Sequence, residues 1–343
     1  MPDQTNDRKL EHIRAIENDP LTDRSKQYFD AIRLTHRALP EIALGEVNTS
    51  CSFLGYDLSF PLLISSMTGG DHKLVKTINR NLAMAAQKTG VAMAVGSQRV
   101  LFTNPASRES FELREFAPDV PLIGNLGAVQ FNCGMTAEQA QFAVDCLNAD
   151  ALYLHLNPLQ EAVQPEGDTD FSDLGEKISR LAAQLSVPVM LKEVGSGLSP
   201  ADIKLGLAAG ITYFDVAGCG GTSWSRIESH RRRDNVDLGI VFQDWGIPTP
   251  MALKMANNYL DRATIVASGG LRDGIDMVKS VILGASLCGM AAPLLKPAMQ
   301  SADAVVEEIE KIKTEFRTAM FLLGAPDVAT LFNNRSFLLE SAS

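Results

Sequence analysis

The sequence predicts an α/β fold, a (β/α)8 TIM barrel, on three observations. Short apolar runs recur along the 343 residues, and eight of them have the length of a buried strand. Each run is followed by Gly, Ser, Thr, Asn, Ala or charged residues. Segments with apolar residues at helical spacing separate many of the runs. In such a barrel the loops at the carboxyl ends of the strands build the active site, so the pattern predicts both the fold and the place of the chemistry.

The eight predicted strands are continuous apolar runs without strict polar alternation, which is typical of parallel strands buried on both faces. They are Phe60–Ile64, Val91–Val95, Val120–Ile123, Ala151–Leu154, Val187–Leu191, Tyr213–Ala217, Thr264–Ala267 and Leu287–Met290.

Five helices are predicted between the strands from apolar periodicity and from end signals. A Gly follows the first of them at Gly90, a good position for a left-handed cap, and Thr136 with Gln139 matches a capping box. The five are Leu74–Thr89, Thr136–Leu147, Asp173–Leu185, Ser199–Ala209 and Arg272–Leu283. Alternating strands and helices are typical of βαβ units with right-handed crossovers.

We expect a single domain, since a barrel takes about 250 residues. It would comprise an N-terminal extension (1–59), the barrel (60–295) and a C-terminal helical segment (296–343). The extension is expected to hold a helix near Leu10–Glu17 and a strand at Val47–Phe53 that plugs the barrel bottom. Residues 219–258 form a long insert, and Ser301–Leu323 is a long amphipathic helix ending at Gly324.

Composition narrows the function classes. A net charge of −10 argues against nucleic-acid binding, which needs a basic face. The one basic cluster, His230–Arg233, is interpreted as a solvated loop or an intersubunit contact. Five scattered cysteines without a C-x-x-C motif suit the cytoplasm. The polar N-terminus predicts no signal peptide, and no apolar stretch has the length of a membrane span.

Two glycine-containing strand ends predict a phosphate site. Ser268–Arg272 follows the seventh strand and Gly289–Ala292 the eighth, where barrels frequently bind phosphate through backbone N–H groups. The alternative is that the glycines only make tight turns. P-loop and Rossmann fingerprints are absent from the sequence.

Lys192 is predicted at the carboxyl end of the fifth strand. A lysine there can form a Schiff base or set a positive charge against an electron-rich cofactor. The alternative is a lysine paired with an internal carboxylate.

A polar group follows the fourth strand. His155 and Asn157 are two residues apart, so a strand would point both to one face. Gln160 and Glu161 follow, and Glu161 is a candidate ligand for a hard cation such as Mg²⁺, completed by water and substrate phosphate. The alternative for His155 is a local hydrogen bond.

Arg8 and Lys9 form a basic pair on an acidic chain. They are either a solvated helix start or part of a segment that folds over the barrel mouth to clamp a diphosphate. Arg99 is a second candidate anion contact, through its fork of donors.

Together these residues resemble the type 2 isopentenyl-diphosphate isomerases, a flavin-dependent family, over residues 8–325. The resemblance rests on an ordered set of motifs: Arg8-Lys9-x-Glu11-His12, Ser66-Met67-Thr68-Gly69-Gly70, Ser97-Gln98-Arg99, His155-x-Asn157-x-x-Gln160-Glu161, Lys192-Glu193-Val194-Gly195, Gly220-Gly221-Thr222-Ser223-Trp224 and Ser268-Gly269-Gly270.

The resemblance implies specific roles for these positions. FMN contacts would be Ser66, Met67, Thr68, Ser97, Asn125, Lys192 and Thr222, with the FMN phosphate on Gly270, Leu271, Arg272, Ala291 and Ala292. Substrate contacts would be Arg8, Lys9, His12, Ser97, Gln98, Arg99 and Gln160; Gln160, His155, Asn157 and Lys192 would be catalytic, and Glu161 would bind Mg²⁺.

The implied activity is the interconversion of isopentenyl and dimethylallyl diphosphate in isoprenoid biosynthesis. A proton would be added at one carbon of the alkene and removed from another, with reduced FMN as the cofactor. NAD(P)H would be the reductant, Lys192 would stabilise the anionic reduced flavin, and the enzyme would be a cytoplasmic homotetramer or homo-octamer. Three alternatives stay open: an FMN barrel oxidoreductase of a small 2-hydroxy acid, a Schiff-base aldolase acting through Lys192, and a barrel that only binds a phosphorylated ligand.

Overall fold

The computed structural model describes residues 5–24, 26–67, 69–231 and 237–339. Thr68 and the arginines at 232 and 233 lie outside these residues, as do the side chains of Arg8 and Lys9.

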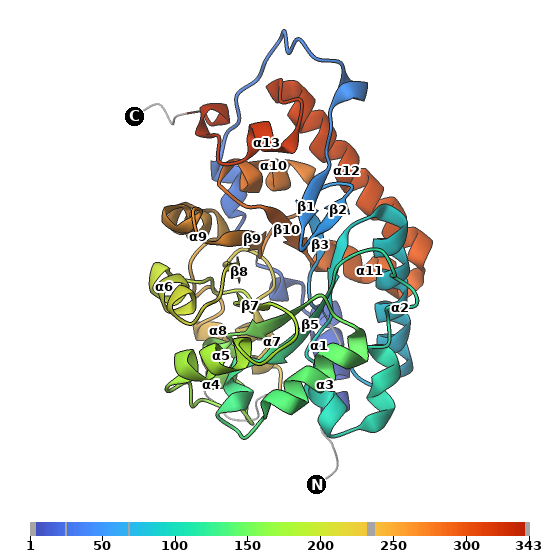
Figure 1. Ribbon diagram of the computed structural model, residues 1–343, viewed down its shortest axis with the longest axis vertical. Helices are drawn as coiled ribbons and strands as arrows, with labels where there is room; N and C mark the ends of the chain where they lie inside the picture. The colour runs from blue at the N-terminus through green and yellow to red at the C-terminus, as the bar shows by residue number, and fades with distance from the viewer. Residues whose placement is uncertain (1–4, 25, 68, 232–236, 340–343) are drawn as a thin grey trace.

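Eight parallel strands close into a barrel, so the predicted fold class is confirmed (Figure 1). Around the barrel the order is β10-β3-β4-β5-β6-β7-β8-β9. The strands are β3 (Leu62–Ile64), β4 (Ala92–Ala94), β5 (Leu122–Gly127), β6 (Ala151–His155), β7 (Val189–Lys192), β8 (Tyr213–Asp215), β9 (Thr264–Ser268) and β10 (Leu287–Met290). Nearly all of their residues are buried, which explains the unbroken apolar runs in the sequence.

The helices surround the barrel. The predicted ones form as α2 (Lys73–Thr89), α3 (Ala137–Leu147), α5 (Leu174–Ala182), α6 (Pro200–Ala208), α10 (Gly274–Ile282) and α12 (Ala302–Leu323). The others are α4 (Pro158–Val163), α7 (Trp224–Ser229), α8 (Leu238–Val241), α9 (Thr249–Ala256), α11 (Ala292–Gln300) and α13 (Val328–Leu331). The long α12 packs along α2, α10 and α11.

Local signals set the helix ends. Gly90 caps α2 in the left-handed region with φ 65°, and Gly324 does the same for α12 with φ 70°. Thr136 and Gln139 form the predicted capping box of α3. The connection from β4 to β5 differs from the usual unit, because it consists of two 3-10 helices, Gln98–Phe102 and Pro105–Ser110.

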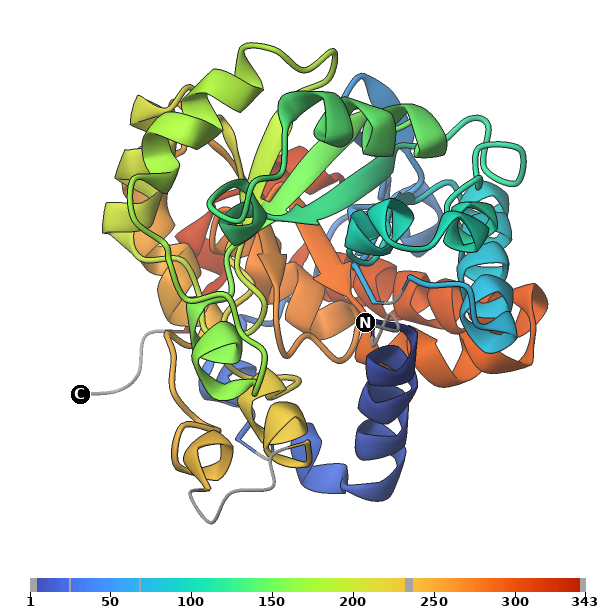
Figure 2. The same ribbon diagram turned by 90° about the horizontal axis from the view of Figure 1, so that it is seen from below.

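The N-terminal extension contacts both ends of the barrel. The predicted plug is a hairpin of β1 (Cys51–Phe53) and β2 (Tyr56–Leu58), whose Phe53 and Leu58 pack in the barrel interior against residues such as Leu63. The first helix, α1 (Thr5–Asn18), is longer than expected and packs on α7 (Figure 2, where α1 is dark blue). None of the helices in the described ranges is long and apolar enough to cross a membrane.

Candidate active site

One cavity of about 600 Å³ opens at the carboxyl ends of the barrel strands. The segments after all eight strands line it, and His12 and Ile16 of α1 close one side. The chain segments that follow the strands therefore converge on one place, as expected for this fold.

Most of the predicted site residues line this cavity. They are His12, Ser66, Met67, Ser97, Arg99, Asn125, His155, Asn157, Gln160, Glu161, Lys192, Thr222, Gly270, Leu271, Arg272, Ala291 and Ala292. Thr68 and the side chains of Arg8 and Lys9 are outside the described part of the chain. The structure thus brings together residues that are up to 280 positions apart in the sequence.

Gln98 is the predicted substrate contact that the structure places elsewhere. Its side chain is fully buried, donates from Nε2 to the Ala143 carbonyl at 2.8 Å, and accepts at Oε1 from the Asn125 N–H at 3.0 Å. The reason is local: residues 98–102 form a 3-10 helix, which turns successive side chains in different directions. Gln98 therefore supports β5 rather than lining the cavity.

Glycine backbone builds the cavity wall after β8 and β9. Gly270 has φ +80°, and a Cβ there would lie 2.5 Å from the carbonyl carbon of Gly220. A Cβ on Gly221 would lie 2.7 Å from the Gly270 nitrogen. The two loops are therefore packed backbone against backbone, leaving no room for side chains. Nearby, no side chain caps the start of α11 at Ala291, which leaves a helix N-terminus of the kind that binds anions.

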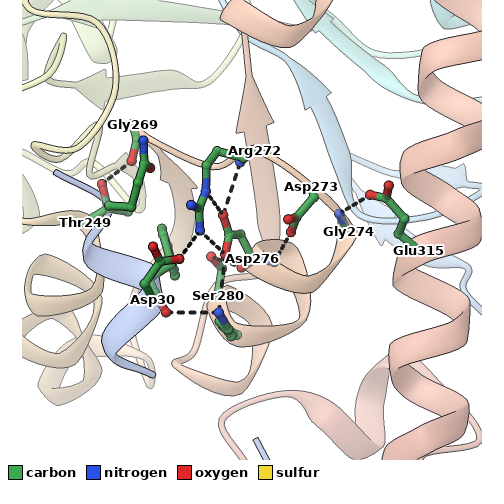
Figure 3. A network of polar contacts seen from close by, with 12 residues as sticks. Asp30, Thr249, Gly269, Arg272, Asp273, Gly274, Asp276, Ser280 and Glu315 are labelled. Carbon is green, nitrogen blue, oxygen red and sulfur yellow. Dashed lines mark hydrogen bonds and ion pairs between the residues drawn. The ribbon is translucent and has the colours of Figure 1, made fainter. Parts of the chain in front are cut away.

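A polar network holds the loop after β9 in place (Figure 3). The Arg272 guanidinium donates to Asp276 Oδ2 at 2.9 Å and to Asp30 Oδ1 at 2.6 Å, and its backbone N–H reaches Asp276 Oδ2 at 3.3 Å. The hydrogen bonds to Asp276 and Asp30 raise the pKa of Arg272. Thr249 Oγ1 donates to the Gly269 carbonyl at 2.5 Å. Both the guanidinium and the N–H of Arg272 thus already have partners, so an anion here would rely on the other backbone donors.

Lys192 lies at the end of β7 and is 7% exposed. Its Nζ donates to the Glu193 carbonyl at 2.7 Å and lies 5.8 Å from the Tyr153 ring centre. Burial lowers the pKa of Lys192, while the charges of Asp215 and Glu193 oppose that change. Asp215, fully buried on β8 in register with Lys192, is an internal carboxylate whose charge acts on this lysine, although the two side chains form no direct ion pair.

A hydrogen-bonded chain joins the ends of β3, β5 and β6. Asn125 Nδ2 donates to Ser66 Oγ at 2.8 Å, and Asn125 Oδ1 is 2.7 Å from His155 Nδ1. Because this oxygen can only accept, His155 carries its proton on Nδ1 in this arrangement. His155 therefore does make the local hydrogen bond, and it also lines the cavity.

Glu161 is 6% exposed at the cavity wall. Asn157 Nδ2 donates to its Oε1 at 2.8 Å, while the Asp168 N–H donates to Oε2 at 2.8 Å. Gln164 also donates to Oε2. The following loop folds tightly over it, since a Cβ on Gly167 would lie 1.8 Å from the Glu161 carbonyl oxygen.

The oxygens around Glu161 fit a hard cation only in part. Asn157 Oδ1 is buried next to this carboxylate and has no hydrogen-bond partner. Within the described ranges, no three His, Cys, Asp or Glu side chains come together as a metal site. Mg²⁺ is commonly held by one or two carboxylates with water and substrate phosphates, so the residues suit a Mg²⁺ that arrives with a phosphorylated ligand.

Glu228 is a buried carboxylate that sequence reasoning missed. It lies on α7, where it accepts from Gln160 Nε2 at 2.8 Å, from Arg231 Nη1 at 2.8 Å, and contacts His12 Nε2 at 3.0 Å. Burial alone would raise the pKa of Glu228, but the hydrogen bonds and the charge of His12 lower it to about 2. The available signal was an acidic residue four positions after Trp224, beside the basic cluster.

Ion pairs hold α1 over the cavity. Asp19, just after α1, receives Arg226 Nε at 2.6 Å and lies 2.8 Å from His230 Nε2. Glu11 on α1 pairs with Arg231 at 2.9 Å. The basic cluster is therefore an intramolecular contact to the N-terminal extension at the two described positions, His230 and Arg231.

Comparisons with known proteins agree with this geometry. A family model described as FMN-dependent dehydrogenase matches residues 4–103 and 136–338. The chain is 59% identical to the isopentenyl-diphosphate delta-isomerase of Paracoccus zeaxanthinifaciens over 338 residues, covering 97% of each chain. It is 57% identical to that of Hydrogenovibrio crunogenus, again covering 97% of each, and 43% identical to that of Rickettsia prowazekii, covering 95% and 96%.

Solved structures share the fold at low sequence identity. A mutant flavocytochrome b2 with pyruvate bound superposes with a TM-score of 0.68 at 18% identity, covering 96% of this chain and 82% of that one. An oxidized active mutant of (S)-mandelate dehydrogenase gives 0.67 at 16% identity, covering 98% and 99%. From the family match and the close relatives together, the chain belongs to the FMN-dependent, type 2 isopentenyl-diphosphate delta-isomerases.

Proposed function

We propose that this chain interconverts isopentenyl diphosphate and dimethylallyl diphosphate in isoprenoid biosynthesis, using reduced FMN and Mg²⁺ in the cavity at the strand ends and NAD(P)H as the reductant. One observation carries the proposal: a single cavity joins a glycine-built wall, suited to a flavin phosphate, with a wall of charged side chains, suited to a metal diphosphate. Family membership supports the same activity.

The residues present fit FMN at one end of the cavity. The N–H groups of Gly270 and Leu271 and the uncapped start of α11 at Ala291 and Ala292 would hold its phosphate. Ser66, Met67, Thr68, Ser97, Asn125, Lys192 and Thr222 would hold its ring system. Reduced FMN, when bound, supplies the group that exchanges a proton with the alkene, which ordinary side-chain acids protonate poorly.

The chain itself would bind and orient the substrate. Arg8, Lys9, His12, Ser97 and Arg99 would hold the diphosphate, with Glu161 binding its Mg²⁺; neutralised in this way, the diphosphate is fixed without taking part in the bond changes. In this structure Arg99 pairs with Asp168 at 3.1 Å, and the Asp168 N–H donates to Glu161, so Asp168 links the two side chains. The hydrogen bond from Asn157 to Glu161 would fix the orientation of this carboxylate.

Gln160, His155 and Lys192 would border the reacting carbons. Glu228 accepts from the Gln160 amide at 2.8 Å, which orients that side chain, and Asn157 donates to Gln160 Oε1 at 3.2 Å. The carbon–carbon double bond moves when a proton is added at one carbon and removed from another, so the residues must exclude water and fix the alkene in one pose. The cover of α1, with Ile16 in the wall, supports that exclusion.

An FMN-dependent oxidoreductase of a small 2-hydroxy acid is the second candidate, and the likeness to flavocytochrome b2 favours it. Such an enzyme would be expected to place a histidine after β9, where this chain has Ser268, Gly269 and Gly270. Two buried carboxylates, Glu161 and Glu228, lie at or beside the cavity and disfavour an anion that brings no metal.

We also propose that the protein is a cytoplasmic homotetramer or homo-octamer in which each chain folds as one domain. All five cysteines are free thiols, which supports a reducing compartment. Val241 and Trp245 are 76% and 63% exposed near α8, and such apolar side chains support an association surface. Light scattering on the purified protein measures the mass of the assembly directly.

The activity is tested on protein reconstituted with FMN and Mg²⁺. We expect yellow protein that releases FMN on denaturation and converts isopentenyl diphosphate only after reduction by NAD(P)H or dithionite. Protein that never binds FMN, or that binds and reduces it yet leaves isopentenyl diphosphate unchanged, would rule the proposal out. Oxidation of a 2-hydroxy acid coupled to FMN reduction would favour the second candidate.

A further inference from the structure

Asp215 is a buried carboxylate beneath the cavity to which the proposed function assigns no role. It ends β8, is 0% exposed, and stands in register with Lys192 on the neighbouring β7. Ser268 Oγ donates to its Oδ1 at 2.6 Å, and the Ala217 N–H donates to the same oxygen at 3.1 Å. Lys192 and Ser268 line the cavity, so Asp215 lies directly behind its floor.

A lone buried carboxylate in a barrel interior is strongly destabilising unless a cation and hydrogen bonds compensate it. The two hydrogen bonds from Ser268 and Ala217 favour the charged form of Asp215. The cation whose charge acts on Asp215 is its register partner, Lys192. Lys192 in turn depends on Asp215, because a buried ammonium loses its proton readily without a negative partner.

The other titratable groups that face Lys192 do not replace Asp215. From β6 come Tyr153, whose ring lies 5.8 Å from Nζ, and His155, its register partner. Glu193 follows Lys192 directly after β7, but its carboxylate accepts the N–H groups of the following loop, including Val194 and Gly195 at 2.6 Å each. Glu193 contacts the ammonium through its backbone carbonyl instead.

We infer that Asp215 is a positioning residue that keeps Lys192 charged at the floor of the cavity, so that a cation always faces the flavin. Lys192 would touch the flavin, whereas Asp215 acts only through Lys192 from behind. Burial lowers the pKa of Lys192 and raises that of Asp215, and each charge opposes the change in the other. The inference deepens the proposed function and rests on it for the place of FMN beside Lys192.

The test uses FMN-loaded protein with the flavin oxidised, so that no turnover is involved. The absorbance of bound FMN is followed while the pH is raised from neutral to alkaline, in the wild type, Asp215→Asn, and each of these combined with Lys192→Met. A transition that disappears with Lys192→Met belongs to Lys192. We expect this transition to occur in Asp215→Asn at a pH lower than in the wild type by about one unit or more.

Glu193→Gln is the matched control, because it removes an adjacent buried carboxylate that accepts hydrogen bonds from the following loop. The transition pH in Glu193→Gln should move less than that in Asp215→Asn. If Asp215→Asn does not retain FMN, Ser268→Ala keeps the carboxylate but removes a hydrogen bond to its charged form, and should move the transition in the same direction by a smaller amount. An unchanged or higher transition pH in the variant tested would overturn the inference.

The inference and the proposed function fail in different ways. An active isomerase whose Lys192 transition ignores Asp215 would leave the function standing and remove the role of Asp215. A Lys192 transition that depends on Asp215, in protein inactive on isopentenyl diphosphate, would do the opposite.

Discussion

The two halves of the cavity wall are built by different means. After β8 and β9 the wall is glycine backbone, where the loops at Gly220 and Gly270 pack so closely that no Cβ fits between them. Between β4, β6 and α7 the wall includes charged side chains such as Arg99 and Glu161, which are held by Asp168 and Asn157, while Glu228 is buried behind Gln160. A wall of backbone has a fixed shape and suits a resident cofactor. A wall of hydrogen-bonded and charged side chains can exchange partners and suits a charged ligand that enters and leaves.

Gly270→Ala should have the largest effect, because it breaks the backbone-built half. The new Cβ would lie 2.5 Å from the Gly220 carbonyl carbon at a residue with φ +80°. We expect loss of bound FMN and a fall in the free energy of unfolding of about 2 kcal/mol or more. Flavin absorbance per chain and denaturant unfolding measure the two.

Gly210→Ala is the matched control for this prediction. Gly210 has nearly the same φ, +86°, but nothing lies within 4 Å of its Cβ position. Gly210→Ala should cost about 1 kcal/mol, for the left-handed backbone alone, and leave FMN bound. Equal losses in the two variants, with FMN retained in both, would show that the packing of the two loops is irrelevant.

Glu161→Gln should break the charge-built half while leaving the cofactor half intact. The carboxylate is the candidate Mg²⁺ ligand, and even indirect changes at metal sites cost about 10–100-fold. We expect isomerase activity to fall by about a hundredfold or more and its response to added Mg²⁺ to disappear, with FMN content unchanged. Glu176→Gln, an exposed carboxylate on α5, is the control. A variant that still responds to Mg²⁺ as the wild type does would exclude Glu161 as the ligand.

Glu228→Gln should change how the stability of the protein depends on pH. The pKa of Glu228 is lowered from 4.5 to about 2 in the folded protein. Its contribution to stability is therefore present above the unfolded pKa and is lost as the pH falls through the folded one. It is on the order of 3 kcal/mol at neutral pH.

We therefore expect Glu228→Gln to unfold at lower denaturant concentration at neutral pH. Between about pH 4.5 and about pH 2 its stability should decline less steeply than that of the wild type. Parallel pH profiles for the two proteins would contradict the role given to Glu228.

Asp19→Asn should have the smallest effect, because it loosens only the cover of α1. Arg226, the largest cause, together with His230 lowers the pKa of Asp19 to about 2, so the residue is charged at neutral pH. Ion pairs of this kind contribute about 1 kcal/mol or less. We expect faster amide hydrogen exchange in α1 with the barrel unchanged, whereas Asp303→Asn, which removes the exposed Lys88 pair, should not affect α1. Unchanged exchange in α1 would mean that these pairs do not hold it.

The fold was readable in the sequence because buried parallel strands leave a continuous apolar signal. Leu122–Gly127 is buried throughout, and the sequence marks its start by an apolar run. Helix ends were equally local, as Gly90 and the Thr136 capping box show. The missing α-helix between β4 and β5 was not readable, because its replacement by two 3-10 helices depends on packing rather than on a local motif.

The candidate site was readable where its residues follow strands, and unreadable where pairing is distant. Asp19 and Arg226 meet across 207 positions, and no local pattern links them. Glu228 gains its importance only when α7 packs against α4 and α1. Gln98 shows the opposite case, since its neighbours Ser97 and Arg99 line the cavity while the 3-10 turn directs it into the core.

In the proposed reaction, an alkene diphosphate is isomerised on reduced FMN in this cavity without net oxidation. The direct measurement follows isopentenyl diphosphate by NMR in D2O, under anaerobic conditions, with protein whose FMN has been reduced once and whose flavin absorbance is recorded throughout. We expect many turnovers per reduced flavin, deuterium entering the carbon skeleton, and a flavin that stays reduced. Consumption of one reduced flavin per product, or product without deuterium, would contradict the proposed reaction.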